Sequence, residues 1–415
     1  MKIILTNLRA ALTVVALSTV SIVSASHKPD DMRVNYLTAP LGIDRTPVFS
    51  WKLSTDGGSN GQTSYQIEVT DDNGEMLWDS GKIDAETPYG ILYEGTPLQS
   101  SRRYSWRVRI WDADGVECPW SDPSYFETAL LDSSDWQAHW IEENDDAKYV
   151  EKNPGAVVFA KNYEIQKPVR RARAYTSGLG VFSLEVNGAK VSDNVLEPLQ
   201  TDYDKSVIYS TYDITDHIGA DGQLRFAATV AGGMYDNPAT ERYSKINTIF
   251  GRKRFIMQVL LDYEDGTSEI LATDGSWLVS PSPTVFASWY GGEDFDAAYN
   301  GNNWSQAREC ASEVGELRAR FSPALKVVEQ WKASDVRKLA DGSYIVDFGT
   351  NIAGTYRFTL KGDKGSKIQI YPCEVLSAKG GHGQTNGSCG TPIYDCYTFA
   401  GNDGKEEWGP EFVYH

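Results

Sequence analysis

The chain has 415 residues, of which 41% are hydrophobic and 23% charged, a balance typical of globular proteins with room for about two to four domains. Its formal net charge of −18 argues against a nucleic acid or an anionic membrane surface as a partner, because both are bound through patches of Lys and Arg. A neutral or cationic ligand suits this charge better. The 12% aromatic content favours strands and also suits surfaces that stack on sugar rings.

Residues 1–25 have the features of an export signal. Lys2 and Arg9 accompany a short apolar run at residues 10–17, and the small residues at 23–25 form a cleavage signature. We therefore predict a signal peptide over residues 1–25 rather than a membrane span, and no later stretch is apolar enough to cross a bilayer. The signal looks bacterial, so the predicted location is the periplasm or the extracellular space.

From residue 31 to about residue 130, short alternating runs are separated by turn residues. In Tyr104–Ile110, the aromatic and aliphatic residues share one face while Ser and Arg share the other, as in a strand with one side in water. Thr63–Val69 alternates in the same way, and Asp71–Gly74 is a strong turn signal. The spacing predicts a β-sandwich of about 100 residues.

A polar cluster at residues 132–135 marks a boundary, and a second β-rich region, 134–305, follows it. Val181–Val186 closes on Asn187-Gly188, which is the strongest short-range signal for a hairpin. Phe255–Tyr263 closes on another turn, and helical periodicity is nearly absent. The region is therefore predicted to be β-sheet throughout.

A third region, residues 314–415, carries Ser343–Phe348, Thr355–Leu360 and Ser366–Tyr371 as candidate strands. A glycine-containing segment between the last two predicts that they form a hairpin. Residues 412–414 follow a Gly-Pro pair and have the composition of a strand that begins where the chain stops. We therefore expect this third sandwich to be incomplete at its C-terminus.

Eight short motifs are spread along nearly all of the chain after residue 25. In order, they are Pro40–Asp44, Pro47–Trp51, Leu77–Gly81, Ser134–Ala138, Leu184–Gly188, Thr201–Asp204, Tyr290–Ala297 and Asp347–Gly354. Each motif alone is weak, but together and in this order they resemble the N-terminal half of a bacterial α-L-rhamnosidase of glycoside hydrolase family 78.

The resemblance implies a fibronectin-III-like sandwich at residues 31–130, a jelly roll at 134–305 and a further sandwich at 314–415. In the family, an (α/α)6 barrel that holds the catalytic carboxylates follows these domains. No position here matches the family's acid cluster, so we predict an all-β chain of consecutive sandwiches with no barrel and no catalytic residue. Leu199-Gln200 replaces a frequent Gly-Trp of the family, and Thr350 replaces a frequent Gln. The loss of that Trp removes a stacking platform from the jelly roll.

These features lead to three hypotheses about function. The first is that the chain is the accessory β part of a secreted α-L-rhamnosidase, which hydrolyses terminal α-L-rhamnosides with inversion, and that it is inactive alone. Its partners would then be rhamnose-containing glycans or glycosides and the missing barrel. The second is a free-standing carbohydrate-binding module. The third is an unstable fragment without function, because an unfinished sheet exposes an edge and an apolar face.

The best acidic cluster contains Glu293, Asp294 and Asp296, beside Trp289 and Tyr290. Hydrolysis of a glycoside normally needs two carboxyl groups across one sugar, so clustered acids are the candidates to consider. In an extended segment Asp294 and Asp296 share a face while Glu293 points away. The five residues are therefore predicted to be either structural at a domain junction or, as the alternative, a carbohydrate-binding site, with catalysis the least favoured role.

The sequence gives no clear metal site or cofactor motif. The five His residues lack the spacing of metal ligands, and five Cys are too few and too odd in number for a disulfide framework. Free thiols are the simpler expectation, although a Cys389–Cys396 disulfide is an alternative in an oxidising compartment. Asp262, Glu264 and Asp265 resemble a calcium loop, but a hairpin turn explains them equally well.

Overall fold

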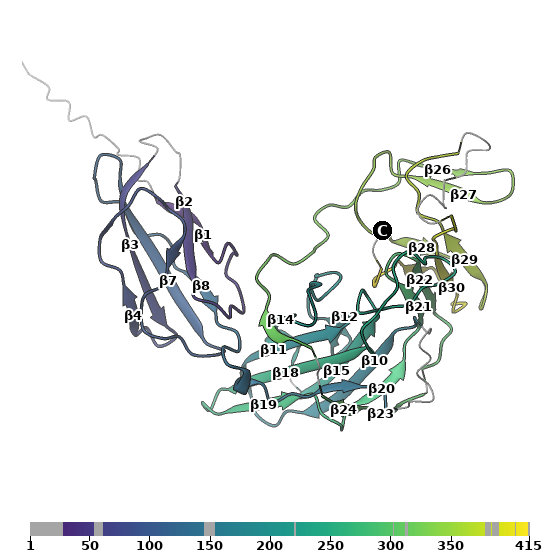
Figure 1. Ribbon diagram of the computed structural model, residues 1–415, viewed down its shortest axis with the longest axis horizontal. Coiled ribbons are helices and arrows are strands. Elements are labelled where there is room, and N and C mark those ends of the chain that lie inside the picture. The colour runs from purple at the N-terminus through teal and green to yellow at the C-terminus, as the bar shows by residue number, and fades with distance from the viewer. Residues whose placement is uncertain are drawn as a thin grey trace, which may run out of the picture.

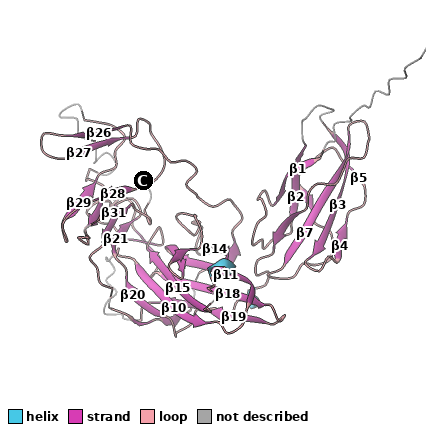
Figure 2. Cartoon of the chain, turned by 180° about the vertical axis from the view of Figure 1, so that it is seen from behind, coloured by secondary structure: helices cyan, strands magenta, loops and turns pink. Residues whose placement is uncertain are grey.

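The computed structural model describes residues 28–53, 61–144, 154–219, 221–301, 303–311, 314–377, 383, 390–402 and 404–413. Within these residues the helices are two single 3-10 turns, η1 (Ser133–Asp135) and η2 (Thr215–His217), and all other regular structure is strand. The fold is all-β, as predicted, and the described part of the chain contains no (α/α)6 barrel. Figure 2 shows strands and loops almost throughout.

The predicted signal peptide, residues 1–25, lies outside the described residues. Among the helices that are described, none is long and apolar enough to span a bilayer.

The first domain is a sandwich of two antiparallel sheets. One sheet has the order β1-β2-β6, and the other has the order β4-β3-β7-β8, with β5 paired to β3. Alternation along the strand at Tyr104–Ile110 buries its aromatic and aliphatic residues, as the sequence predicts. The Phe49 and Trp106 rings meet between the sheets with centroids 4.6 Å apart. The strands are β1 (Pro29–Val34), β2 (Val48–Leu53), β3 (Gln62–Asp71), β4 (Met76–Asp79), β5 (Ile83–Asp84), β6 (Ile91–Leu92), β7 (Arg103–Asp112) and β8 (Ser124–Glu127).

The second domain packs a six-stranded sheet, β13-β12-β15-β10-β20-β23, against a seven-stranded one, β24-β9-β18-β11-β14-β25 with β19 on β18. The predicted hairpin at Asn187-Gly188 joins β12 to β13, and both residues have positive φ. The strands are β9 (Trp140–Glu142), β10 (Val157–Glu164), β11 (Val169–Leu179), β12 (Val181–Val186), β13 (Ala189–Lys190), β14 (Ser206–Asp213), β15 (Gln223–Ala231), β18 (Arg254–Tyr263), β19 (Ser268–Ala272), β20 (Leu278–Pro281), β23 (Ser305–Gln306), β24 (Arg308–Cys310) and β25 (Glu316–Ala319).

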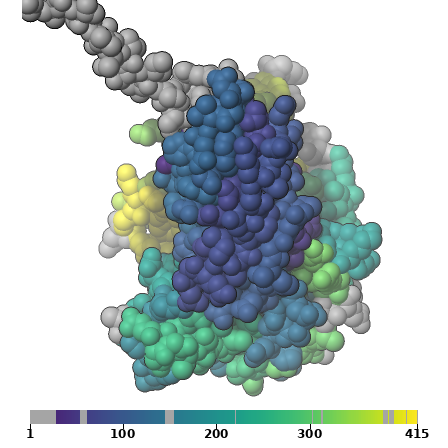
Figure 3. Space-filling model, turned by 90° about the vertical axis from the view of Figure 1, so that its left-hand side faces the viewer, coloured from purple at the N-terminus to yellow at the C-terminus, as the bar shows by residue number. Residues whose placement is uncertain are grey.

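The core of the second domain is closed on both sides by these sheets. Phe159 and Phe255 stack with ring centroids 6.0 Å apart, and the Trp277 ring, fully buried, lies 6.0 Å from Phe255. Aromatic pairs of this kind add to the stabilisation that burial alone provides. In Figure 1 this domain forms the base of the molecule, and the first domain stands on it at one end. Figure 3 shows the first domain in front, with its lower end resting on the second.

The third region is less regular and shares strands with the segment that precedes it. Its largest sheet has the order β21-β22-β30-β29, and two-stranded pairs form from β26 and β27, β28 and β31, and β16 and β17. The strands are β16 (Asp236–Asn237), β17 (Thr248–Ile249), β21 (Thr284–Ser288), β22 (Gly292–Asp296), β26 (Asp335–Lys338), β27 (Tyr344–Asp347), β28 (Phe358–Leu360), β29 (Lys367–Ile370), β30 (Asp395–Thr398) and β31 (Glu406–Trp408).

Two local predictions for the third region were wrong. β28 and β29 flank the predicted turn but do not pair with each other, because β28 pairs with β31 and β29 pairs with β30. Of the predicted strand at 412–414, residue 412 lies in a bend with residue 411, residue 413 has no regular structure, and residue 414 lies outside the described residues. Phe412 and Val413 are nevertheless buried, since they pack in a cluster with Trp289.

Residues 320–377, which we call the uncovered segment, differ from the rest of the described chain. None of them is buried. The segment nevertheless carries many exposed large hydrophobic side chains: Phe321, Leu325, Val327, Val328, Trp331, Val336, Tyr344, Ile352, Tyr371, Val375 and Leu376. A concentration of apolar side chains on one short stretch is characteristic of an interaction surface.

Candidate functional site

The predicted sugar-binding cluster lies at the junction between the second domain and the third region. Trp289 is buried and Tyr290 is half-buried, with ring centroids 6.5 Å apart, at the turn between β21 and β22. Glu293, Asp294 and Asp296 follow on β22, which pairs in parallel with β30. The structure therefore gathers the five predicted residues into one junction.

Glu293 is fully buried and holds the end of the described chain in place. Its Oε2 accepts hydrogen bonds from the backbone N–H groups of Glu411 at 2.8 Å and Phe412 at 2.9 Å, and its Oε1 accepts one from Thr284 Oγ1 at 3.3 Å. Burial raises the pKa of Glu293 to about 8, although the two backbone donors act in the opposite direction. The backbone N–H of Glu293 itself donates to Asp395 Oδ1 at 2.6 Å.

The other two carboxylates of the cluster also have protein partners. Asp294 forms a bidentate ion pair with Arg242, with both N–O distances at 2.7 Å. Arg242 also donates to the Tyr394 carbonyl at 2.9 Å and stacks on the Tyr394 ring, 3.6 Å from its centroid. Asp296 accepts from the Ala298 N–H at 3.0 Å within a turn. These contacts favour the structural interpretation of the cluster, while sugar binding by it stays a prediction.

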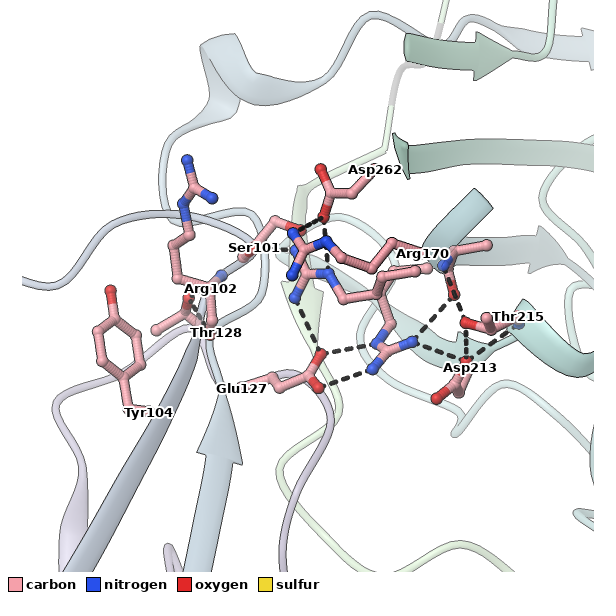
Figure 4. Close-up of polar contacts among 12 residues, drawn as sticks. Ser101, Arg102, Tyr104, Glu127, Thr128, Arg170, Asp213, Thr215 and Asp262 are labelled. Atoms are coloured by element: carbon pink, nitrogen blue, oxygen red, sulfur yellow. Dashed lines mark hydrogen bonds and ion pairs between the residues drawn. The ribbon is translucent and has the colours of Figure 1, made fainter. Parts of the chain in front are cut away.

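A second location, which the sequence did not single out, is a cleft of about 500 Å³ between the first and second domains. The Asp71–Gly74 turn and the start of β7 contribute one wall, and β11, the end of β14 and η2 contribute the other. We call this the interdomain cleft, and its lining residues are Asp72, Arg103, Arg170, Arg171, Arg173, Asp213, Thr215 and Asp216. Figure 4 shows the network of polar contacts that joins the two domains there.

The floor of the cleft is a buried ionic network that joins the domains. Arg173 of β11 donates to both carboxylate oxygens of Glu127 of β8, at 2.7 and 2.8 Å, and pairs with Asp213 at 2.7 Å. Burial acts to lower the pKa of Arg173, but its contacts with Glu127 and Asp213 outweigh this and raise it. A bidentate, buried Arg–carboxylate pair fixes orientation as well as charge, so the two domains are held in one geometry here.

Arg171 adds a second link to the same floor. It donates to Asp262 Oδ2 at 2.8 Å and to the carbonyl of Ser101 in the first domain at 2.6 Å. Burial acts to raise the pKa of Asp262, but hydrogen bonds from Ser268 and Arg171 outweigh it, and the pKa lies below its ordinary value. Asp262, one of the candidate calcium ligands, is therefore engaged with protein groups. Among the residues described, no group of three or more His, Cys, Asp or Glu is arranged to hold a metal ion.

The sequence did contain a signal for this cleft. The run Val169–Tyr175 has the apolar character of a buried strand, yet it carries arginine at 170, 171 and 173. Arginine is almost never buried unless it is paired, so such a strand predicts buried acidic partners. What the sequence could not indicate is that Glu127, from the other domain, is one of them.

Four of the five cysteines lie in the described residues. Cys118, Cys310, Cys373 and Cys396 form no disulfide with one another in the described residues, and Cys118 and Cys396 are buried. Cys389, the other member of the predicted alternative disulfide, lies outside the described residues.

Comparison with known families matches three consecutive family models along the chain. The Rha78A-like, N-terminal immunoglobulin domain matches residues 29–132, the α-L-rhamnosidase N-terminal domain matches 167–338, and the bacterial α-L-rhamnosidase concanavalin-like domain matches 337–415. The chain belongs to the bacterial α-L-rhamnosidase family. Within that family, it corresponds to the N-terminal part.

Curated members of the α-L-rhamnosidase family align with nearly the whole chain. An α-L-rhamnosidase of Formosa agariphila is 30% identical over 93% of this chain and 45% of its own length. One from Alteromonas sp. strain LOR is 29% identical over 94% of this chain and 44% of its own length. The chain therefore spans about half the length of the curated relatives it matches.

Solved α-L-rhamnosidase structures have the same arrangement of sheets. The enzyme from Dictyoglumus thermophilum superposes with a TM-score of 0.81 at 30% identity, over 93% of this chain and 46% of that one. The enzyme from Aspergillus terreus gives a TM-score of 0.84 at 26% identity, and the match covers 94% of this chain and 46% of that one. The Streptomyces avermitilis enzyme, solved with L-rhamnose, gives a TM-score of 0.83 at 21% identity, and the match covers 94% of this chain and 55% of that one. At this identity the match supports the fold alone.

Proposed function

We propose that this chain is the accessory β part of an exported α-L-rhamnosidase and is inactive without the catalytic barrel. The observation that carries the proposal is the match to three rhamnosidase family models in chain order, together with alignment of 93% of this chain to only 45% of a relative. The longer protein would hydrolyse terminal α-L-rhamnosides with inversion, through residues outside this sequence. Rhamnose-containing glycans or glycosides would be its substrates.

The state of the acidic residues supports the absence of catalysis in this chain. An inverting glycosidase needs two carboxyl groups about 6.5–9.5 Å apart, with space for a sugar and a water between them. Glu293 and Asp395 are the buried carboxyl groups at the predicted cluster, but both are used in hydrogen bonds to the protein. The interdomain cleft holds acids as well, yet its floor carboxylates are neutralised by arginine.

The missing barrel is proposed as the natural intrachain partner. Support comes from the uncovered segment, where Val328 is 88% exposed and Trp331 is 50% exposed although both are apolar. Burying apolar surface is worth about 25 cal/mol per Å², so a stretch like this gains stability from a covering partner. We propose that the barrel packs on this segment.

We also propose export to the periplasm or the extracellular space. The support is the sequence of residues 1–25, which has the charge, apolar run and cleavage signature of a signal peptide. Sequencing the N-terminus of the protein recovered from the periplasm of an expressing bacterium tests this proposal. Recovery of an uncleaved chain from the cytoplasm alone would refute it.

The central test is an activity assay on the purified chain with an aryl α-L-rhamnoside. The expected result is no release of the aryl group above a heat-killed control. Turnover by the chain alone would overturn the proposal that it is inactive. A parallel assay on a full-length relative provides the positive control for the substrate and buffer.

Glycan binding by this chain itself is a second candidate function, as a free-standing carbohydrate-binding module. The interdomain cleft favours it, because a volume of about 500 Å³ lies within the range of small-molecule sites and the lining is rich in donors and acceptors. Calorimetric titration with L-rhamnose and rhamnose-containing glycans tests it. Flat titrations across that panel would remove this candidate.

A further inference from the structure

The interdomain cleft contains charged groups that the ionic network of its floor does not use. The Arg103 guanidinium stacks on the Tyr125 ring, 3.8 Å from its centroid, but donates no hydrogen bond to any described residue. The Arg170 side chain is 58% exposed, and its one ion pair, to Asp262, is long at 3.9 Å. Two guanidinium groups, one from each domain, are thus available to a ligand.

Acceptors complement these donors on the rim. Asp72 and Asp216 line the cleft, and their carboxylates accept no hydrogen bond from the residues that the structure describes. Asp213 is already engaged, because its Oδ1 accepts from the Thr215 N–H and hydroxyl and pairs with Arg173. The rim therefore has two guanidinium donors and two carboxylate acceptors, which balance in charge.

The floor has one donor without an acceptor. Arg171 Nη1 is buried, has no hydrogen-bond partner in the described structure and lies 3.6 Å from Glu127 Oε2. Because this atom is buried and already faces the Glu127 carboxylate, a ligand in the cleft meets the guanidinium groups of the rim instead. Arg171 itself is held by Asp262 and Ser101 and keeps the floor beneath the rim in place.

We propose that the interdomain cleft binds a short, uncharged segment of a glycan through its hydroxyl groups. Each sugar hydroxyl both donates and accepts, so it can satisfy a carboxylate and a guanidinium at once. The balanced charge of the rim argues for an uncharged ligand rather than a polyanion, in keeping with the net charge of −18. The choice of a glycan rests on the proposed function in rhamnoside degradation.

The buried link between the domains makes this cleft a preformed site. Its walls come from different domains, but the bidentate Arg173–Glu127 pair and the Arg171–Ser101 contact fix their separation. A preorganised site loses less entropy on binding than one that must close around its ligand. Ligand binding should therefore leave the relative orientation of the domains unchanged.

The test is calorimetric titration of the full chain with uncharged rhamnose-containing di- and trisaccharides. A double variant, Arg103→Gln with Arg170→Gln, should bind about ten-fold more weakly or worse, because hydrogen bonds to charged groups are lost. The matched control is Arg102→Gln, since Arg102 is adjacent and exposed but does not line the cleft, and its guanidinium lies apart from the network in Figure 4. The control should stay within about two-fold of the wild type. Circular dichroism checks that all variants are folded.

Three results would overturn the inference. They are no binding of any uncharged oligosaccharide, equal affinity in the wild type and the folded double variant, or binding of acidic sugars only, with an affinity that falls steeply as salt is raised. None of these depends on the aryl rhamnoside assay. Turnover in that assay would refute the proposed inactivity of the chain and leave the cleft untouched, so the two failures are distinguishable.

Discussion

The second domain and the uncovered segment are built from the same kind of sequence but end in opposite states. In the second domain, sheets of six and seven strands face each other, and residues such as Phe159, Phe255 and Trp277 are fully buried. In residues 320–377 the strands form pairs or edges, and no residue is buried. Alternation is enough to make a strand, but burial requires a second layer on the apolar side. The contrast indicates that the segment belongs to a larger packing unit.

The largest effect that separates the two regions should come from a matched pair of tryptophan substitutions. Trp277→Ala removes a fully buried ring from the core of the second domain, and we expect it to lower the free energy of unfolding by about 3–5 kcal/mol. Trp331→Ala removes a ring that is 50% exposed in the uncovered segment, and we expect a change below about 0.5 kcal/mol. Urea unfolding followed by far-UV circular dichroism measures both. Equal losses would show that Trp331 is packed in solution.

The next largest effect should come from the ionic link beneath the interdomain cleft. Glu127→Ala leaves Arg173 buried without its bidentate partner, and we expect a loss of about 3 kcal/mol. The comparison is the exposed pair between Asp193 and Lys326 of the uncovered segment, where Asp193→Ala should cost less than about 1 kcal/mol. Urea unfolding of the two variants under the same conditions provides the measurement. A loss at Glu127 no larger than at Asp193 would contradict the buried link.

A smaller, pH-dependent effect is expected at Glu293, where the second domain meets the third region. Burial raises the pKa of the Glu293 carboxyl group from its ordinary value of 4.5 to about 8 in the folded protein. The folded state therefore holds the carboxyl proton more tightly than the unfolded state does. The contribution to stability is complete below pH 4.5 and is lost as the pH rises from 4.5 to 8. Because each pKa unit is worth at most about 1.4 kcal/mol and the backbone donors favour the ionised form, we expect a loss of about 2 kcal/mol.

Glu293→Gln provides the control for that titration. Glutamine is similar in shape to the protonated acid and can accept from both backbone N–H groups while donating to Thr284. Urea unfolding at pH 5 and pH 8 should show a fall in stability for the wild type and a much smaller fall for the variant. If both proteins lose the same stability, the pH dependence does not arise at Glu293.

The sequence predicted the fold better than the site, and particular residues show why. The strand at Tyr104–Ile110 and the hairpin at Asn187-Gly188 were predicted because alternation and turn chemistry are local properties. The prediction that β28 pairs with β29 was wrong, because the choice of partner among nearby strands depends on the whole sheet. The all-β class therefore followed from the sequence, while the pairing in the third region did not.

The sites depend on contacts that are distant in sequence. Glu293 binds the backbone of Glu411 and Phe412, 118 and 119 residues away, and nothing local to its motif indicates these partners. Arg173 finds Glu127 across a domain boundary, 46 residues away. The sequence groups Glu293, Asp294 and Asp296 in one short motif, but whether their carboxylates face a ligand or the protein is decided by tertiary structure.

The smallest effect on stability is expected from polar substitutions on the uncovered segment itself. In a triple variant, Val328→Ser, Trp331→Ser and Val336→Ser, we expect the free energy of unfolding to change by less than about 0.5 kcal/mol per site, because all three side chains are at least half exposed. The same variant should bind less of a dye that reports exposed apolar surface and should self-associate less. Dye fluorescence and analytical ultracentrifugation measure these two properties.

A matched triple variant in the first domain, Met76→Ser, Leu92→Ser and Val116→Ser, decides whether this behaviour is special to the uncovered segment. These side chains are also 49–55% exposed, but each lies on or beside a strand of a domain whose core is already closed. Single exposed apolar residues of that kind are ordinary, so dye binding and self-association should hardly change. Equal reductions in both variants would remove the distinction between the two regions. A reduction confined to the uncovered segment would identify it as the surface on which a missing partner packs.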